Sequence, residues 1–319
     1  MIEVKNLTKR YGNHLAVDHL NFTVESGKIY GFLGPNGAGK STTMNIMTGY
    51  LGATEGQVLI DGHDILKEPE EAKKNIGYLP EIPPLYMEMT VREYLEFAAE
   101  LKGIKKDKRE PQIEEVIRLA KLRDVENRLI QNLSKGYKQR VGLAQAVLGF
   151  PEIIILDEPT VGLDPKQIIE IRELIRKLAK NHTVILSSHI LAEVREVCDY
   201  IMIISGGKLV ASDTTENLEN MMSGKGQIEI EARTSKEEMD HVIHRTGKVK
   251  EVKYHTSASG ITTAQITAKG GEDIREELFL AFSHADIPLI TLNQSKTTLE
   301  EIFLELTQGS GNRMIKEER

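Results

Sequence analysis

The sequence has little cysteine and no long uninterrupted apolar run. Its single cysteine, Cys198, excludes an internal disulfide and indicates a reducing compartment such as the cytosol, so we expect a small, buried apolar side chain there. The best candidate for a membrane span, VGLAQAVLGFPEIIIL, is broken by Gln145, Pro151 and Glu152, so no spanning helix is predicted. The opening MIEVKNLTKRY lacks the apolar stretch of a secretory signal, and none is expected.

An excess of basic charge is also missing. Lysine and arginine number 41 against 48 aspartates and glutamates, which gives a net charge of −7. Because nucleic-acid binding needs a basic surface to neutralise phosphates, nucleic acid is not expected as a partner. Apolar residues make up 40% of the 319, which is enough for a real core. This length predicts one large domain with a small one, or two comparable domains.

Strand-like and helix-like patterns alternate over the first two-thirds of the chain. Alternating or continuous apolar patterns bounded by turn residues predict strands at 1–11, 19–24, 56–62, 28–34, 151–159, 183–189 and 199–212. Helical spacing predicts helices at 91–103, 111–122, after LSKG, and at 165–180. The continuous apolar strands indicate a parallel sheet that is covered on both faces and connected by right-handed crossovers.

The pattern restarts near residue 220 with a strand, a helix, two paired strands, a helix and a strand. These elements are expected at 227–232, 235–246, 248–256, 261–268, 272–285 and 287–292, and a final helix is expected at 297–307. The β-α-β-β-α-β order predicts a small ferredoxin-like domain. The expected division is 1–220 with a helical subdomain at about 84–149, then 221–308, then a tail at 309–319.

GPNGAGKST, residues 34–42, is the strongest chemical signal in the sequence. It matches G-x-x-x-x-G-K-[ST] between a predicted strand and a predicted helix. Its glycines let backbone N–H groups turn around phosphates, and a helix beginning near Lys40 adds the positive end of its dipole. We expect Lys40 to contact the β- and γ-phosphates and Ser41 to ligate Mg²⁺. The alternative is a chance glycine-rich turn.

Two acids end the buried run IIILDEP. An aspartate at the end of such a strand, here Asp157, can hold Mg²⁺ directly or through water. The adjacent Glu158 can accept a proton from the attacking water. The alternative is a helix N-cap with an acid in the first turn, which DEPT alone could form.

Five motifs occur in a specific order along the chain: the phosphate loop, LSKG, LDEP, GLDP and SSH. Through this order, residues 1 to about 215 resemble the ATP-binding subunits of ABC transporters. The resemblance implies an α/β fold: a P-loop ABC ATPase domain with a mixed sheet core, an antiparallel β subdomain and a helical subdomain. The small C-terminal α+β ferredoxin-like domain follows it. ATP and Mg²⁺ are the implied cofactors. The implied partners are a second ATP-binding subunit, in a homodimer or a heterodimer, and an integral membrane permease on a separate chain.

LSKGYKQR, residues 133–140, corresponds to the family's signature, usually written LSGGQ. Lys135 replaces the first glycine and Tyr137 the glutamine. The resemblance implies that Ser134 and the backbone N–H of Gly136 contact the γ-phosphate of a nucleotide held by the opposite subunit. Two ATP molecules would then lie in a head-to-tail symmetric dimer. Ser134 is also expected to cap its own helix, which aids anion binding.

Further roles are implied one position at a time. Tyr11 in KRYG matches the aromatic residue that stacks on adenine, and His189 in LSSH matches the switch histidine near the γ-phosphate; ordinary structural roles are the alternatives. Asp164 in GLDP matches the loop that links the two sites across the dimer. Glu81 in GYLPE departs from the usual glutamine, which helps to ligate Mg²⁺ and the attacking water. A carboxylate can do both but adds negative charge near ATP, and it favours the export-type branch that resembles multidrug and gliding-motility subunits.

The candidate residues therefore form three overlapping sets. The catalytic set is Glu158, His189 and Glu81, and the metal-binding set is Ser41, Glu81 and Asp157. The nucleotide-binding set is Tyr11, Gly34, Pro35, Asn36, Gly37, Ala38, Gly39, Lys40, Ser41, Thr42, Ser134, Gly136 and Asp164.

The leading hypothesis is an ATPase that powers an ABC transporter of the exporter type. It would do so by ATP-driven dimerisation at the cytoplasmic face of the plasma membrane. One alternative is a soluble ABC ATPase acting on a ribosome or a nucleic-acid assembly, but this chain has one cassette, no long heptads and one cysteine. Another is a nucleotide sensor without turnover, which Glu158 and His189 disfavour. EIPPLYMEMT, with Leu85, Tyr86, Met87 and Met89, is either core filling or a groove for a permease helix.

Overall fold

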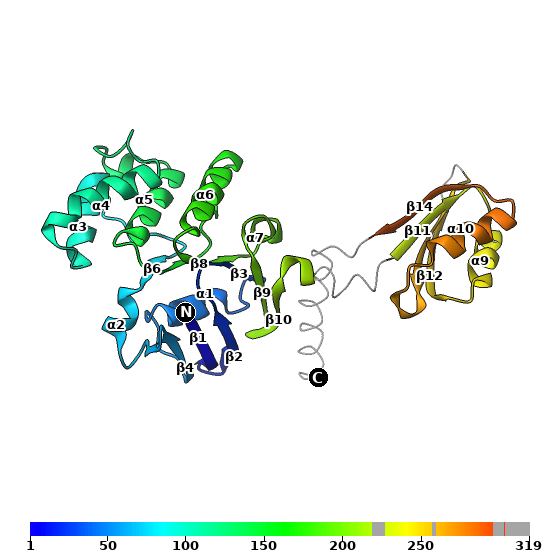
Figure 1. Ribbon diagram of the computed structural model, residues 1–319, viewed down its shortest axis with the longest axis horizontal. Coiled ribbons are helices and arrows are strands. Elements are labelled where there is room, and N and C mark those ends of the chain that lie inside the picture. Colours follow the sequence, from blue (N-terminus) through cyan, green and yellow to red (C-terminus); the bar gives the residue numbers. More distant parts are fainter. Residues whose placement is uncertain (219–226, 257–259, 296–302, 304–319) are drawn as a thin grey trace. The chain divides into compact units, whose positions relative to one another are not determined.

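The computed structural model describes residues 1–218, 227–256, 260–295 and 303 (Figure 1). They divide into two compact units, one at Met1–Thr215 and one that begins at Glu216. Each unit has its own buried apolar cluster. The expected domain boundary near residue 220, nearly all of the expected helix at 297–307 and the expected tail at 309–319 lie outside the described residues.

A six-stranded sheet with the order β10-β9-β3-β8-β7-β6 forms the centre of the first unit. Its strands are β3 (Ile29–Leu33), β6 (Ile76–Leu79), β7 (Ile153–Leu156), β8 (Thr183–Ser188), β9 (Tyr200–Ser205) and β10 (Lys208–Thr214). All neighbours are parallel except β10 and β9. Every residue of β3, β7 and β8 is buried, as their continuous apolar runs predict.

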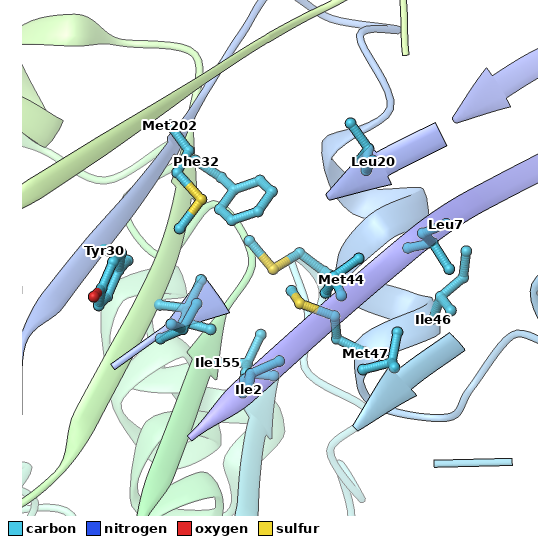
Figure 2. Close-up of a cluster of buried hydrophobic side chains, with 14 of the residues drawn as sticks. Ile2, Leu7, Leu20, Tyr30, Phe32, Met44, Ile46, Met47, Ile155 and Met202 are labelled. Carbon is cyan, nitrogen blue, oxygen red and sulfur yellow. The ribbon is translucent and has the colours of Figure 1, made fainter. Parts of the chain in front are cut away.

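A second, antiparallel sheet has the order β2-β1-β4-β5. Its strands are β1 (Ile2–Tyr11), β2 (His14–Val24), β4 (Glu55–Ile60) and β5 (His63–Asp64). The strand expected at 19–24 starts five residues earlier, because Tyr11 and His14 already pair across the turn at Gly12 and Asn13. Helix α1 (Lys40–Met47) belongs to the same core, since Met44 and Met47 lie among side chains of both sheets (Figure 2).

Three helices, α3 (Val91–Leu101), α4 (Lys106–Leu119) and α5 (Lys135–Val147), gather at the end of the unit away from β1, β2 and β4 (Figure 1). A capping box between Thr90 and Glu93 starts α3. The predicted start of α4 at residue 111 was wrong, because the helix begins at Lys106 and contains Pro111. Further helices of the unit are α2 (Pro69–Lys74), α6 (Pro165–Leu178), α7 (Leu191–Val197) and a 3₁₀ turn, η1 (Ile130–Asn132).

The second unit follows the expected β-α-β-β-α-β order. Its elements are β11 (Gln227–Ala232), α9 (Lys236–Arg245), β12 (Val249–Thr256), β13 (Thr262–Ala268), η2 (Lys269–Gly271), α10 (Arg275–His284) and β14 (Leu289–Ser295). The antiparallel sheet has the order β12-β13-β11-β14. Apolar side chains of α9 and α10, such as Met239 and Phe282, form one buried cluster with Ile228 and Ile230 of β11, one of the two central strands.

The burial of Cys198 and the character of the described helices bear on two expectations from the sequence. Cys198 is buried with 8% of its surface exposed, as expected of a small apolar side chain. In the part of the chain that is described, no helix has the length and apolar character needed to cross a bilayer.

Candidate nucleotide-binding site

A cavity of about 500 Å³ lies where the loop after β3 meets the β1–β2 turn and the ends of β7 and β8. Its lining comprises Tyr11, His14, Ala16, Asn36, Gly37, Gly39, Lys40, Ser41, Thr42, Glu81, Glu158, Val161 and His189. Segments separated by up to 178 residues in sequence thus meet at the carboxyl ends of parallel strands, because β3 and β8 are neighbours and β7 pairs with β8. Ligands of open α/β sheets bind at this edge.

The start of α1 is built to receive an anion. Gly39 is the N-cap residue with φ of 103°, and no side chain caps the helix. A Cβ at residue 39 would lie 2.5 Å from the carbonyl oxygen of Ala16, so only glycine fits there. The first turn carries no acidic residue, and therefore nothing in it repels a phosphate. Uncapped N–H groups and the helix dipole together favour a phosphate at this point.

Lys40 places a cation beside that helix terminus. Its ammonium donates to the carbonyl oxygens of Gly34 at 2.8 Å and Pro35 at 3.4 Å. It also lies 3.5 Å from Glu158 Oε1, and the two side chains are only 5% and 8% exposed. The ammonium is thus held at the cavity wall by the loop itself, and Glu158 balances its charge.

Asp157 connects the phosphate loop to the ends of two strands. Ser41 Oγ donates to its Oδ1 at 3.3 Å, and Ser187 Oγ donates to the same oxygen at 2.5 Å. The N–H of Glu158 in turn donates to Ser187 Oγ at 2.9 Å. Ser187 therefore orients both acids, although the sequence analysis did not select it.

Glu158 and His189 form the acid–histidine pair of the site. His189 Nδ1 lies 2.9 Å from Glu158 Oε2, and the imidazole is 40% exposed. Glu158 has a φ of 48°, a left-handed conformation that glutamate seldom adopts. Such strain is typical of functional positions, where the surrounding structure holds a residue in place. The strained backbone directs the carboxylate between Lys40 and His189.

Glu81 lies between two cavities. Its side chain is exposed and lines both the 500 Å³ cavity and a neighbouring one of about 860 Å³. Ser41 and Asp157 also line the larger cavity. The three members of the sequence-predicted metal set therefore lie in one neighbourhood.

Other candidates lie behind or away from the cavity. Gly34, Pro35 and Ala38 are absent from its lining but shape the loop, since the N–H of Ala38 donates to Pro35 O at 3.1 Å. Ser134, Gly136 and Asp164 are not in the lining either. Ser134 caps α5 by accepting from Tyr137 N–H at 3.4 Å. Asp164 caps α6 by accepting from Gln167 N–H at 2.9 Å.

Sequence reasoning missed three lining residues, His14, Ala16 and Val161. His14 is the cross-strand partner of Tyr11, so the Gly-Asn turn signal could have identified it once Tyr11 was assigned. Val161 lies three residues beyond Glu158, on the loop to α6. Nothing in the residue types of Ala16 and Val161 distinguishes them from ordinary packing residues.

Together, the parallel sheet, the glycine-rich loop entering a helix, and the Lys, Asp, Glu and His side chains define a P-loop ATPase. Within the described residues, no group of three or more His, Cys, Asp or Glu side chains could hold a metal by itself.

Comparisons with known proteins identify the family. Residues 17–161 match the family model described as ABC transporter. The chain is 35% identical to the bacitracin transport ATP-binding protein BcrA of Bacillus licheniformis, over 97% of this chain and 98% of that protein. It is 32% identical to the linearmycin resistance ATP-binding protein LnrL of Bacillus subtilis, over 96% and 98%. The chain therefore belongs to the ATP-binding proteins of ABC transporters.

A solved structure extends the comparison to the nucleotide. The dimeric post-hydrolysis structure of the ATP-binding cassette MJ0796, bound to ADP and Pi, is 28% identical with a TM-score of 0.61, and the alignment covers 67% of this chain and 98% of that chain. The expected fold and activity are thus confirmed: the chain is the ATP-binding and ATP-hydrolysing subunit of an ABC transporter. The relatives support the transport hypothesis and not the ribosome or nucleic-acid alternative. They imply a second cassette and a membrane permease as partners.

Proposed function

We propose that two copies of this chain bind two ATP molecules between them and drive an exporting permease from the cytoplasmic face of the membrane. The observation that carries the proposal is the incomplete site of the single chain. Ser134, Gly136 and Asp164 begin two helices outside the cavity that holds Lys40 and Glu158. A head-to-tail second copy would bring these groups to the nucleotide. The names of BcrA and LnrL, which refer to bacitracin transport and linearmycin resistance, support export of a toxic compound.

Mg²⁺ fits the oxygen donors that this site offers. Ser41 hydroxyl and Asp157 carboxylate are hydrogen-bonded to each other, and Glu81 lines the same cavities. Mg²⁺ prefers such hard oxygen ligands and usually keeps waters and phosphate oxygens as further ligands. When bound, the ion would neutralise charge on the β- and γ-phosphates. We assign its protein ligands to Ser41, Asp157 and Glu81.

Hydrolysis requires a proton acceptor beside the γ-phosphate. We assign this role to Glu158, whose buried carboxylate faces the cavity. His189 holds the second carboxylate oxygen and is exposed enough to meet a phosphate. Lys40 releases Glu158 and turns to the phosphates when ATP enters. Tyr11, which belongs to the same lining, stacks on adenine.

The permease would dock beside the larger cavity. Ile82 and Tyr50, which line it, are each 82% exposed. Tyr86 and Met87 follow in the chain and are 48% and 38% exposed, which argues against the core-filling alternative for these two. Exposed aromatic and methionine side chains are suited to receiving an apolar helix.

The two-copy site can be tested by trapping the closed dimer. In Glu158→Gln, ATP should bind without turnover, so a dimer should accumulate and be visible by size-exclusion chromatography with light scattering. Adding Ser134→Arg should leave binding of a fluorescent ATP analogue intact but keep the protein monomeric with ATP. If Ser134 only caps α5, the variant should lose about 1 kcal/mol of stability and still dimerise.

A matched control separates these effects. Ser235 caps α9 in the second unit through the same kind of side-chain contact. Ser235→Arg in the Glu158→Gln background should therefore lose similar stability and keep ATP-driven dimerisation. Dimerisation by the folded Ser134→Arg variant would disprove the two-copy site.

A further inference from the structure

Lys135 carries a charge for which the described part of the chain shows no partner. It is the exposed first residue of α5, at the positive end of the helix dipole, and the first turn has no acid. An ammonium is unfavourable at that end of a helix. Among the described residues, no ion pair or hydrogen bond engages its Nζ. The ammonium is therefore available to pair with a carboxylate of a second copy.

The structure also shows where this ammonium is held. A Cβ at residue 162 would lie 2.2 Å from Lys135 Nζ, so the lysine side chain occupies the space above Gly162. Gly162 has a φ of 71° and belongs to the loop that leads to Asp164 at the start of α6. The cation is thus presented beside Ser134, Gly136 and the 161–164 loop, the groups that the proposed dimer turns toward the partner's nucleotide.

Glu81 carries the opposite charge to Lys135 and lies at the nucleotide cavity. It is exposed at the nucleotide cavity, and no ion pair or hydrogen bond involves its carboxylate within the described part of the chain. The single-chain site already contains Asp157 and Glu158 against one ammonium, that of Lys40. Glu81 therefore adds negative charge where the phosphates of ATP must bind, and a glutamine there would not.

We propose that Lys135 of one copy compensates Glu81 of the other across the shared nucleotide, as a positioning pair for closure of the dimer. The inference rests on the proposed two-copy function and deepens it. In the proposed dimer, Ser134 and Gly136 of one copy would contact the partner's γ-phosphate, and Lys135 lies between them in sequence. Glu81 lines the nucleotide cavity together with Lys40 and Ser41. Lys135 and Glu81 carry opposite charges. Together they would leave the net charge around the phosphates of ATP unchanged, whereas either one alone would change it.

The test is a double-mutant cycle in the Glu158→Gln background. The measured quantity is the ATP concentration that gives half-maximal dimerisation, followed by size-exclusion chromatography with light scattering. Lys135→Gly should raise it about tenfold, which corresponds to about 1.4 kcal/mol. Lys135→Arg, which keeps the charge, should stay within about twofold. Combining Lys135→Gly with Glu81→Gln should return the value to within about threefold of the parent.

A control and the opposing outcomes complete the design. Lys106 is likewise an exposed first residue of a helix, α4, so Lys106→Gly tests the general cost of glycine at such a position. It should leave the half-maximal ATP concentration unchanged. An unchanged half-maximal ATP concentration in Lys135→Gly, relative to the Glu158→Gln parent, would overturn this inference alone. So would a lack of recovery in the double variant. A Glu158→Gln parent that stays monomeric with ATP would overturn the two-copy function and this inference together.

Discussion

Replacing Glu158 by glutamine should change two properties of the site in opposite directions. The carboxylate lies 3.5 Å from Lys40 Nζ, and both groups are almost fully buried. At an effective dielectric constant of about 20, two unit charges at this separation attract by about 5 kcal/mol. ATP must draw Lys40 away from this partner. Removing the carboxylate therefore removes both the proton acceptor and a competitor for the lysine.

The glutamine amide keeps some of the interactions of the Glu158 carboxylate and loses others, and this sets the expected changes in turnover and in ATP affinity. Glutamine cannot take the proton from water, so turnover should fall by about 10² to 10⁴. Its carbonyl oxygen still attracts Lys40, and Gly34 O still accepts from the ammonium at 2.8 Å. The attraction is thus reduced and not abolished. We expect ATP to bind about tenfold more tightly, or about 1.4 kcal/mol.

Two assays separate the effects. Steady-state phosphate release measures turnover, and titration with a fluorescent ATP analogue measures affinity. Glu193→Gln is the matched control, because Glu193 is also buried and accepts from Thr160 and Ser188 but does not line the cavity. It should change neither quantity by more than about threefold. Near-normal turnover in Glu158→Gln would remove Glu158 from the catalytic role, and unchanged affinity would refute its competition with ATP for Lys40.

Three further predictions concern other parts of the molecule. Tyr86→Ala or Met87→Ala should reduce co-purification with the permease while nucleotide titration stays normal; unchanged co-purification would exclude this surface from docking. Because burial raises the pKa of the Cys198 thiol, the native protein should react with iodoacetamide at pH 8 far more slowly than the urea-unfolded protein, as mass spectrometry would measure. A chain ending at residue 218 should still bind ATP, because every motif lies upstream; failure in a variant folded by circular dichroism would show that the two units depend on each other.

The parts of the fold that the sequence predicted well are those set by local pattern. The runs IYGFL, IIIL and TVILSS are apolar on both faces, and each became a fully buried parallel strand. Element boundaries were harder to predict. The early start of β2 depends on pairing with β1, and α4 begins before Pro111, although proline removes one helical hydrogen bond.

The residues of the candidate site also fall into two groups: those set by the local sequence and those set by strand pairing. Lys40 and Ser41 were predictable because loop and helix are contiguous in sequence. Ser187 was not, because its role depends on the register that pairs Leu156 with Leu186 and so brings the ends of β7 and β8 together. His14, by contrast, was predictable once Tyr11 was assigned, because the turn at Gly12 and Asn13 pairs the two residues. Interactions between segments distant in sequence depend on tertiary register, which residue type does not encode.

Ser134 shows how a structural and a functional role can coexist in one side chain. Its Oγ accepts the N–H of Tyr137 to cap α5, and this contact uses a lone pair of the oxygen. The hydroxyl hydrogen is not used by that contact and can still be donated to a phosphate oxygen. At 3.4 Å the cap is long, so the hydroxyl can shift toward an anion at little cost. Capping the helix and contacting the partner's nucleotide are therefore compatible, and only a substitution that blocks the approach, such as Ser134→Arg, separates the two roles.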